Sequence, residues 1–129
     1  MREAAQRGIA ARVELRGYVD DAALLDLFSR ASALVFPSRY EGFGLPPLQA
    51  QAAGLPVVAA RSPVVEEVLG AYAWFAPAGD DAAFAEQLDA VLRGGADVEA
   101  RVAAARAHAR GFSWDAVAER MSHVYRSVL

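Results

Sequence analysis

Three short apolar segments constrain the fold of this chain more than any other feature. They read ALVFPS (33–38), LPVVAAR (55–61) and AYAWFAPA (71–78). Each is apolar almost throughout and is bounded by proline, glycine or arginine, a pattern typical of strands buried on both faces of a parallel sheet. A fourth segment, VELRGYV (13–19), is rich in strand-forming residues and is also expected to be a strand.

Helix-forming segments alternate with these strands. Asp20 and Asp21 suit the cap and first turn of one helix, and Gly54 suits the residue that follows another. The predicted helices cover residues 1–11, 20–31, 46–53, 62–70, 80–93, 98–111 and 113–129. This alternation predicts an α/β fold, a Rossmann-like three-layer α/β/α arrangement with a parallel sheet of about four strands. We expect a single domain over residues 1–129.

The last predicted helix has an apolar stripe at helical spacing, which we expect to pack on the rest of the domain. The stripe consists of Trp114, Ala118, Met121, Tyr125 and Val128. We interpret His108 and His123, which lie far along the chain from any other candidate site, as packing or surface residues.

The composition excludes several function classes. The chain contains no cysteine and no lysine, so disulfides, thiolate metal sites and lysine-dependent chemistry are excluded. The absence of lysine also argues against a response-regulator receiver domain, a small parallel α/β domain whose chemistry needs that residue. The net charge is −3 without a basic stripe, so nucleic acid is not an expected partner. No apolar run approaches the ~20 residues of a membrane span.

The turn PSRYEGFGLPP (37–47) joins a predicted strand to a predicted helix, at the edge of a parallel sheet where ligands bind. Its glycines allow close backbone approach, and the N–H groups of Phe43, Gly44 and Leu45 are predicted to face outward at a helix N-terminus, which suits a phosphate. Glu41 adds an acceptor for hydroxyl donors. A nucleotide-sugar offers both groups. A plain strand-to-helix turn with a solvated acid is an equally good interpretation of the residues alone.

The longer pattern P-S-x-x-E-G-F-G-L-P-P-L-x-A-x-A-x-G-x-P-V-V, beginning at residue 37, resembles the signature of group 1 retaining GT-B glycosyltransferases (glycosyltransferase family 4). The flanking segments RGYV, AWFAPAGDDAAFAEQLDAVL and FSWDAVAERMSHVY resemble that family too, so the resemblance extends over residues 12–129. It implies the C-terminal, donor-binding domain of an enzyme that transfers a sugar from a nucleoside diphosphate sugar to an acceptor hydroxyl with retained configuration.

The resemblance also implies roles for individual residues. Glu41 matches the first glutamate of the family's E-x7-E motif and would orient the donor sugar in catalysis through its hydroxyls. The other positions that match donor-binding residues of the family are Gly17, Tyr18, Val19, Ser38, Gly42, Phe43, Gly44, Leu45 and Gln49. No metal or other cofactor is implied; the substrate would be a UDP-, GDP- or ADP-sugar.

Two departures from the family pattern stand out. Gln49 occupies the place of the motif's second glutamate, which is expected to accept bonds from ribose hydroxyls. An amide oxygen still accepts, but bonds to a charged acceptor are about twice as strong, so we expect weaker donor binding. A tolerated variant with little effect is the alternative.

The second departure is that the family's N-terminal acceptor-binding domain and the start of its C-terminal domain have no counterpart in these residues. We therefore expect a fragment that is inactive alone, with a non-catalytic nucleotide-sugar-binding or structural α/β domain as the alternative function. The expected location is the cytoplasm, with the parent enzyme peripheral at the inner membrane.

Overall fold

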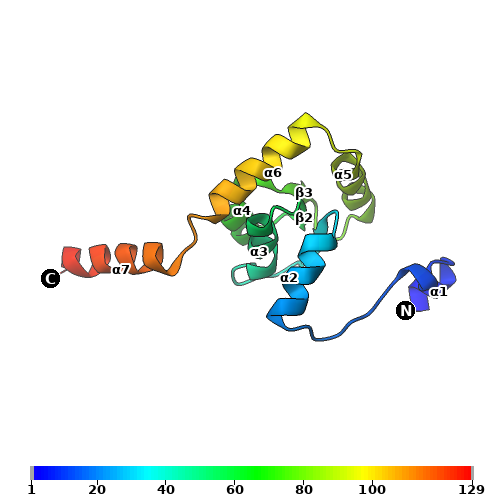
Figure 1. Cartoon of the computed structure of the whole chain (residues 1–129), viewed down its shortest axis with the longest axis horizontal. Coiled ribbons are helices and arrows are strands. Elements are labelled where there is room, and N and C mark those ends of the chain that lie inside the picture. The colour runs from blue at the N-terminus through cyan, green and yellow to red at the C-terminus, as the bar shows by residue number, and fades with distance from the viewer. Residues whose placement is uncertain (1, 129) are drawn as a thin grey trace.

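The computed structural model describes residues 2–128, shown as a ribbon in Figure 1. The strands are β1 (Leu34–Phe36), β2 (Val57–Ala60) and β3 (Trp74–Ala76). The α-helices are α1 (Arg2–Gln6), α2 (Asp21–Arg30), α3 (Leu45–Ala53), α4 (Pro63–Leu69), α5 (Asp81–Arg93), α6 (Ala96–Ala109) and α7 (Trp114–Val128). Two 3₁₀ helices, η1 (Ala10–Arg12) and η2 (Gly70–Tyr72), complete the order.

The sheet is parallel throughout, with strand order β1-β2-β3. Val57 lies opposite Leu34 on one side of the central strand, and Val58 lies opposite Trp74 on the other. All four residues of β2 are buried. The three apolar segments that the sequence singled out are therefore the three strands, and the predicted α/β fold is confirmed.

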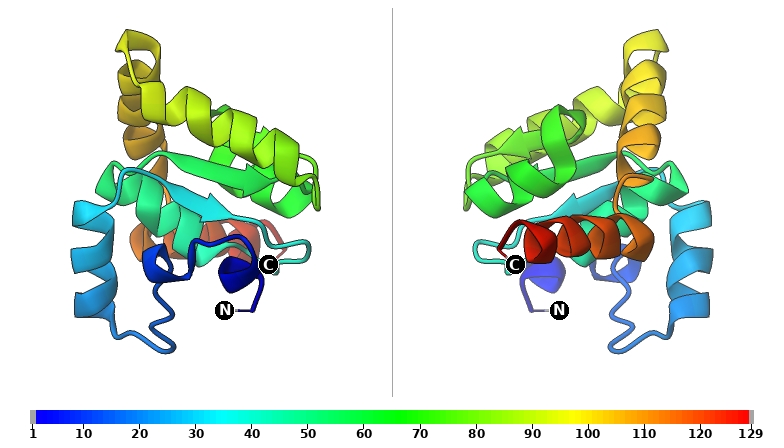
Figure 2. Two further views of the ribbon diagram at one scale, coloured as in Figure 1. Left: turned by 90° about the vertical axis from the view of Figure 1, so that its right-hand side faces the viewer. Right: turned by 90° about the vertical axis from the view of Figure 1, so that its left-hand side faces the viewer.

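Alternate residues of β2 enter two separate cores. Val57 and Ala59 pack with residues of α2, α3 and α4 on one face of the sheet. Val58 and Ala60 pack with Phe84 of α5 and its neighbours on the other face. This alternation follows from the two-residue period of a strand, and it gives the predicted arrangement of helices on both sides of a sheet (Figures 1 and 2).

The prediction of a strand over residues 13–19 was wrong. The segment lies outside the sheet, and in Figure 1 it crosses an open stretch between α1 and α2. Leu15 is 72% exposed and Tyr18 is 93% exposed. Strand-forming residues need a neighbouring strand to satisfy their backbone groups, and within residues 2–128 none lies beside this segment. The sheet consequently has three strands rather than about four.

The first predicted helix is also shorter than expected. Helix α1 ends at Gln6, and Gly8 follows with φ of +68° before η1 begins. A left-handed glycine is a common way to end a helix, which explains why the predicted helix over residues 1–11 is interrupted. Residue 1 lies outside the described residues.

Helix α7 projects from the body of the domain, as Figure 1 shows at its C-terminal end. The expected packing of its apolar stripe was wrong: Trp114 is 88% exposed and Tyr125 is 60% exposed. None of the residues of α7 is buried. Within residues 2–128, no helix combines the length and apolar character needed to cross a membrane.

Candidate functional site

The turn between β1 and α3 ends in a left-handed glycine. Gly44 caps α3 with φ of 87° and ψ of 49°, a conformation that favours glycine over any residue with a Cβ. Pro46 and Pro47 follow in the first helical turn and have no N–H group. Within the described chain, the N–H groups of Phe43, Gly44 and Leu45 donate no hydrogen bond. Three amides without a partner among residues 2–128 thus lie at the positive end of the α3 dipole, an arrangement that suits an anion.

The mouth of this turn is open. Phe43 is 42% exposed and Leu45 is 59% exposed, whereas Gly44 between them is buried beside Pro47 and Val65. Glu41 is half-buried and, among residues 2–128, forms no hydrogen bond or ion pair. The Ser38 hydroxyl donates to the carbonyl of Tyr40, 3.2 Å away, which links the strand end to the turn. The turn therefore combines free donors with a carboxylate acceptor.

Two glutamines of α3 lie on opposite sides of the helix. Gln49, the residue in place of the expected glutamate, is exposed. Gln51 is only 1% exposed, and its Nε2 donates to the carbonyl of Leu69 at 3.3 Å. The Oε1 of Gln51 has no partner among the described residues. No motif singled out this buried amide, although its position three residues after buried Leu48 places it on the inward face.

The predicted base-binding residues Gly17, Tyr18 and Val19 lie in the exposed segment ahead of α2. No hydrogen bond or ring contact within residues 2–128 joins them to the turn at 41–45. Ser38, Glu41 and the 42–45 turn lie together in one loop. Residues 17–19 have no hydrogen bond or ring contact with that loop among the described residues. Their predicted role in donor binding stays a prediction.

Two arginines lie where the strands end. Arg39 rests against Gly79, so closely that a Cβ added at Gly79 would lie 2.9 Å from Arg39 Nη2. Arg61 pairs with Glu66 and lies over the ring of Phe75, with 5.3 Å between the guanidinium carbon and the ring centre. Arg39 forms no ion pair within the described residues, so it is the more available of the two cations.

A line of aromatic rings extends from the turn to the junction of α6 and α7. The rings of Phe43 and Phe112 meet edge to face with centres 6.1 Å apart, and those of Phe112 and His108 meet at 5.3 Å. His108 also contacts the ring of Tyr72 at 5.0 Å, and its Nε2 lies 2.9 Å from the carbonyl of Val68. The packing interpretation of His108 is confirmed. Phe112 was missed, because no local pattern links residues 69 positions apart.

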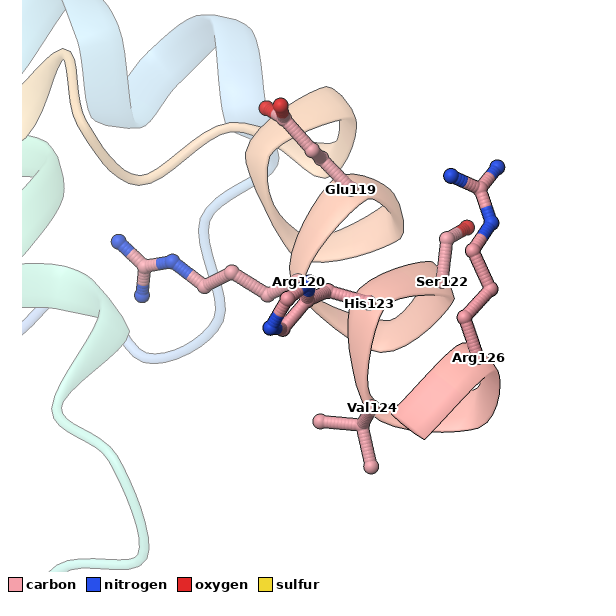
Figure 3. A pocket seen from close by; sticks show the side chains of 6 residues that line it. All are labelled: Glu119, Arg120, Ser122, His123, Val124 and Arg126. Atoms are coloured by element: carbon pink, nitrogen blue, oxygen red, sulfur yellow. The ribbon is translucent and has the colours of Figure 1, made fainter. Parts of the chain in front are cut away.

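Two hollows border α7. One, of about 860 Å³, lies between the turn and the start of α7 and includes Phe43, Leu45, Val68, Phe112 and Val117 in its lining. The other, of about 790 Å³, is shown in Figure 3. Its lining residues, Glu119, Arg120, Ser122, His123, Val124 and Arg126, all belong to α7, so no second element closes it. No cluster of three or more metal-ligating side chains occurs within residues 2–128.

Comparisons with known proteins agree on one family. The family model described as glycosyl transferases group 1 matches residues 1–108. A D-inositol 3-phosphate glycosyltransferase of Streptomyces scabiei is 40% identical and is matched over 98% of this chain and 29% of its own length. A phosphatidyl-myo-inositol mannosyltransferase of Mycobacterium leprae is 36% identical, over 94% of this chain and 33% of its own.

The fold comparison gives the same result. The structure of sucrose-phosphate synthase from Thermosynechococcus elongatus matches with a TM-score of 0.85 and 27% sequence identity. The match covers 98% of this chain and 33% of that protein. The chain therefore spans about a third of the length of the proteins it resembles.

Proposed function

This chain belongs to the glycosyl transferases group 1 family, and on that premise we propose that it supplies the donor-binding part of a glycosyltransferase. The observation that supports the proposal most is the 41–45 turn, where Glu41 and three amides have no hydrogen-bond or ion-pair partner among residues 2–128. The amides suit the diphosphate of a nucleotide-sugar, and the carboxylate suits its sugar hydroxyls.

The proposed reaction transfers a sugar from a nucleoside diphosphate sugar to an acceptor hydroxyl with retained configuration. The bond between the anomeric carbon and the diphosphate oxygen breaks, a bond from that carbon to the acceptor oxygen forms, and the acceptor hydroxyl gives its proton to the leaving diphosphate. Negative charge develops on the leaving diphosphate, and fixed donors aimed at such charge lower the barrier. The α3 amides and the cation of Arg39 would supply that stabilisation without a metal, and Glu41 would hold the sugar rather than attack it.

A second domain would complete the cleft. The turn is open on its outer side, so the acceptor must be held by residues outside this chain's described fold. We expect no measurable transfer by the isolated chain, and we expect binding of a UDP-, GDP- or ADP-sugar. A cytoplasmic location with the parent enzyme at the membrane surface remains a prediction.

Calorimetric titration of the chain with UDP-, GDP- and ADP-sugars, and with the matching nucleoside diphosphates, tests the proposal. One nucleotide series should bind, and Glu41→Gln should weaken binding of the nucleotide-sugar by roughly three- to tenfold, since a hydrogen bond to a charged acceptor is about twice as strong as one to the neutral amide that replaces it. Binding of the nucleoside diphosphate, which lacks the transferred sugar but keeps the ribose, should change much less.

Glu99→Gln is a matched control, because Glu99 is an exposed acid in the first turn of α6. It should leave both affinities unchanged. If none of the nucleotides binds the unmodified chain, the donor-binding proposal is wrong and a structural α/β domain becomes the better interpretation.

A further inference from the structure

The residue at the centre of the turn is held by its side chain. Phe43 lies between Gly42 and Gly44, and glycine leaves the backbone on both sides permissive. Gly44 adopts a left-handed conformation, and an added Cβ at Gly42 would meet no atom within 4 Å. The backbone of Phe43 is therefore restrained mainly by what its ring contacts.

The ring of Phe43 contacts Phe112, which comes from the other end of the described domain. The two rings meet edge to face at 6.1 Å with 75° between their planes. Such a pair contributes about 0.5–1.5 kcal/mol beyond its buried area. Because the contact joins residues 43 and 112, it links the turn to the segment that connects α6 and α7.

Phe112 is itself anchored. Its ring packs edge to face on His108 at 5.3 Å, and the amide of Phe112 donates to the carbonyl of Ala109 at 3.1 Å. His108 in turn lies 2.9 Å through Nε2 from the carbonyl of Val68 in α4. Phe43 is thus connected through the rings of Phe112 and His108 to α4, a helix with three buried residues.

We propose that Phe112 is a positioning residue for donor binding: it acts through Phe43 and keeps the amides of residues 43–45 directed at the diphosphate. This inference rests on the proposed function of the same turn. It assigns a donor-binding effect to a residue that lies outside the turn and follows α6. Removing the Phe112 ring would free Phe43 between its two glycines, and the three amides would then have to be ordered when the ligand binds.

The test compares Phe112→Ala, Phe112→Tyr and Phe112→Leu with the unmodified chain, using the nucleoside diphosphate that binds in the titration above. Phe112→Ala should raise its Kd by roughly two- to tenfold, the range expected for loss of one aromatic pair. It should also shift the backbone amide NMR signals of residues 42–45 in the free chain. Phe112→Tyr retains the ring edge, so its Kd and its amide signals should match those of the unmodified chain. Phe112→Leu should give a Kd and amide shifts between those of Phe112→Ala and the unmodified chain.

The matched control is Tyr125→Ala, which removes an exposed ring of α7 that has no contact with the rings of Phe43, His108 or Phe112. It should change neither the Kd nor the amide signals of residues 42–45. If Phe112→Ala fails to fold, Phe112→Leu carries the same test, because leucine keeps an apolar side chain but has no ring edge.

The outcomes separate this inference from the proposed function. Unchanged affinity and unchanged amide signals in the ring-deficient variant would overturn the role of Phe112 while donor binding stands. A loss of thermal stability without either change would mean that Phe112 is only structural, which overturns the inference too. Failure of the unmodified chain to bind any nucleotide would overturn the proposed function first, before any variant is compared.

Discussion

The two sides of helix α3 carry the same type of side chain, glutamine, in two different environments. The outward side carries Gln49, whereas the inward side carries Gln51, which is buried and donates to the carbonyl of Leu69 at the end of α4. The same amide is thus exposed at one position and 1% exposed two residues later. Gln49 is exposed and accessible to a ligand. Gln51 packs inside the domain, and its Oε1 has no partner among the described residues. Residue type alone therefore does not distinguish a candidate ligand contact from a packing residue.

The largest effect that would test this comparison is expected from Gln51→Glu. Position 51 is 1% exposed, and an uncompensated charge at such a buried position costs about 3–5 kcal/mol. Urea unfolding at pH 7 should show a loss of unfolding free energy of that order. Equal stability would show that the inward side of α3 is open to water.

The pH dependence of the same variant gives a second measurement. Burial raises the pKa of the introduced carboxyl above its unfolded value of about 4.3. The folded state then binds more protons than the unfolded state, so stability falls as pH rises through this window. The gap between Gln51→Glu and the unmodified chain should be small near pH 4 and should widen steadily as the pH rises to neutrality. Gln51→Met, which introduces no charge, should show a gap that does not vary with pH.

A smaller effect is expected at the entrance of the helix, from Gly44→Ala. The left-handed backbone of Gly44 costs a residue with a Cβ about 1–2 kcal/mol. The added methyl group itself has room, since the nearest atom, Cγ of Pro47, would lie 3.5 Å away. Urea unfolding should therefore show a loss of that order. Gly42→Ala is the control, because Gly42 has no positive φ and open space around it, and it should change stability by much less.

The smallest effect is expected on the outward side, from Gln49→Glu. Gln49 is exposed, so the added charge should change the unfolding free energy by no more than about 0.5 kcal/mol. Donor affinity should rise by about three- to tenfold, since ribose hydroxyls would donate to a charged acceptor. Calorimetry with the nucleoside diphosphate measures this rise. Pyrophosphate, which has no ribose, should bind the two proteins equally, and an unchanged nucleotide affinity would contradict the prediction.

The part of the fold that the sequence predicted well is the part with strong local signals. Runs such as ALVFPS and LPVVAAR are apolar throughout, and their burial follows wherever a parallel sheet forms. The segment at 13–19 carries a similar signal in Val13, Leu15 and Tyr18, but a strand also needs a neighbour, which no local pattern reveals. The predicted packing of the apolar stripe of α7 was wrong for the same reason. The helical periodicity of the stripe is present, but periodicity does not show which element packs against a helix.

The candidate site was predictable to the same extent. Its linear motif placed Glu41 and the glycine turn correctly at the end of a strand, because strand, turn and helix follow one another in sequence. The contact between Phe43 and Phe112 could not be predicted from a linear motif, because it depends on how α6 packs against α3 and where α6 ends. Gln51 was not among the predicted residues, because a polar side chain is usually exposed and only its helical spacing from Leu48 indicates the inward face.

The projecting α7 has a geometric consequence. A helix of 15 residues is about 22 Å long, so a pivot of about 10° at residues 110–113 would carry its tip through an arc of roughly 4 Å. Residues 110–113 include Phe112, whose ring contacts Phe43 in the turn. A small rotation at Phe112 would therefore be accompanied by a much larger displacement at the tip of α7. A spectroscopic label near Ser127 would magnify sub-ångström displacements there into distances that are readily measured.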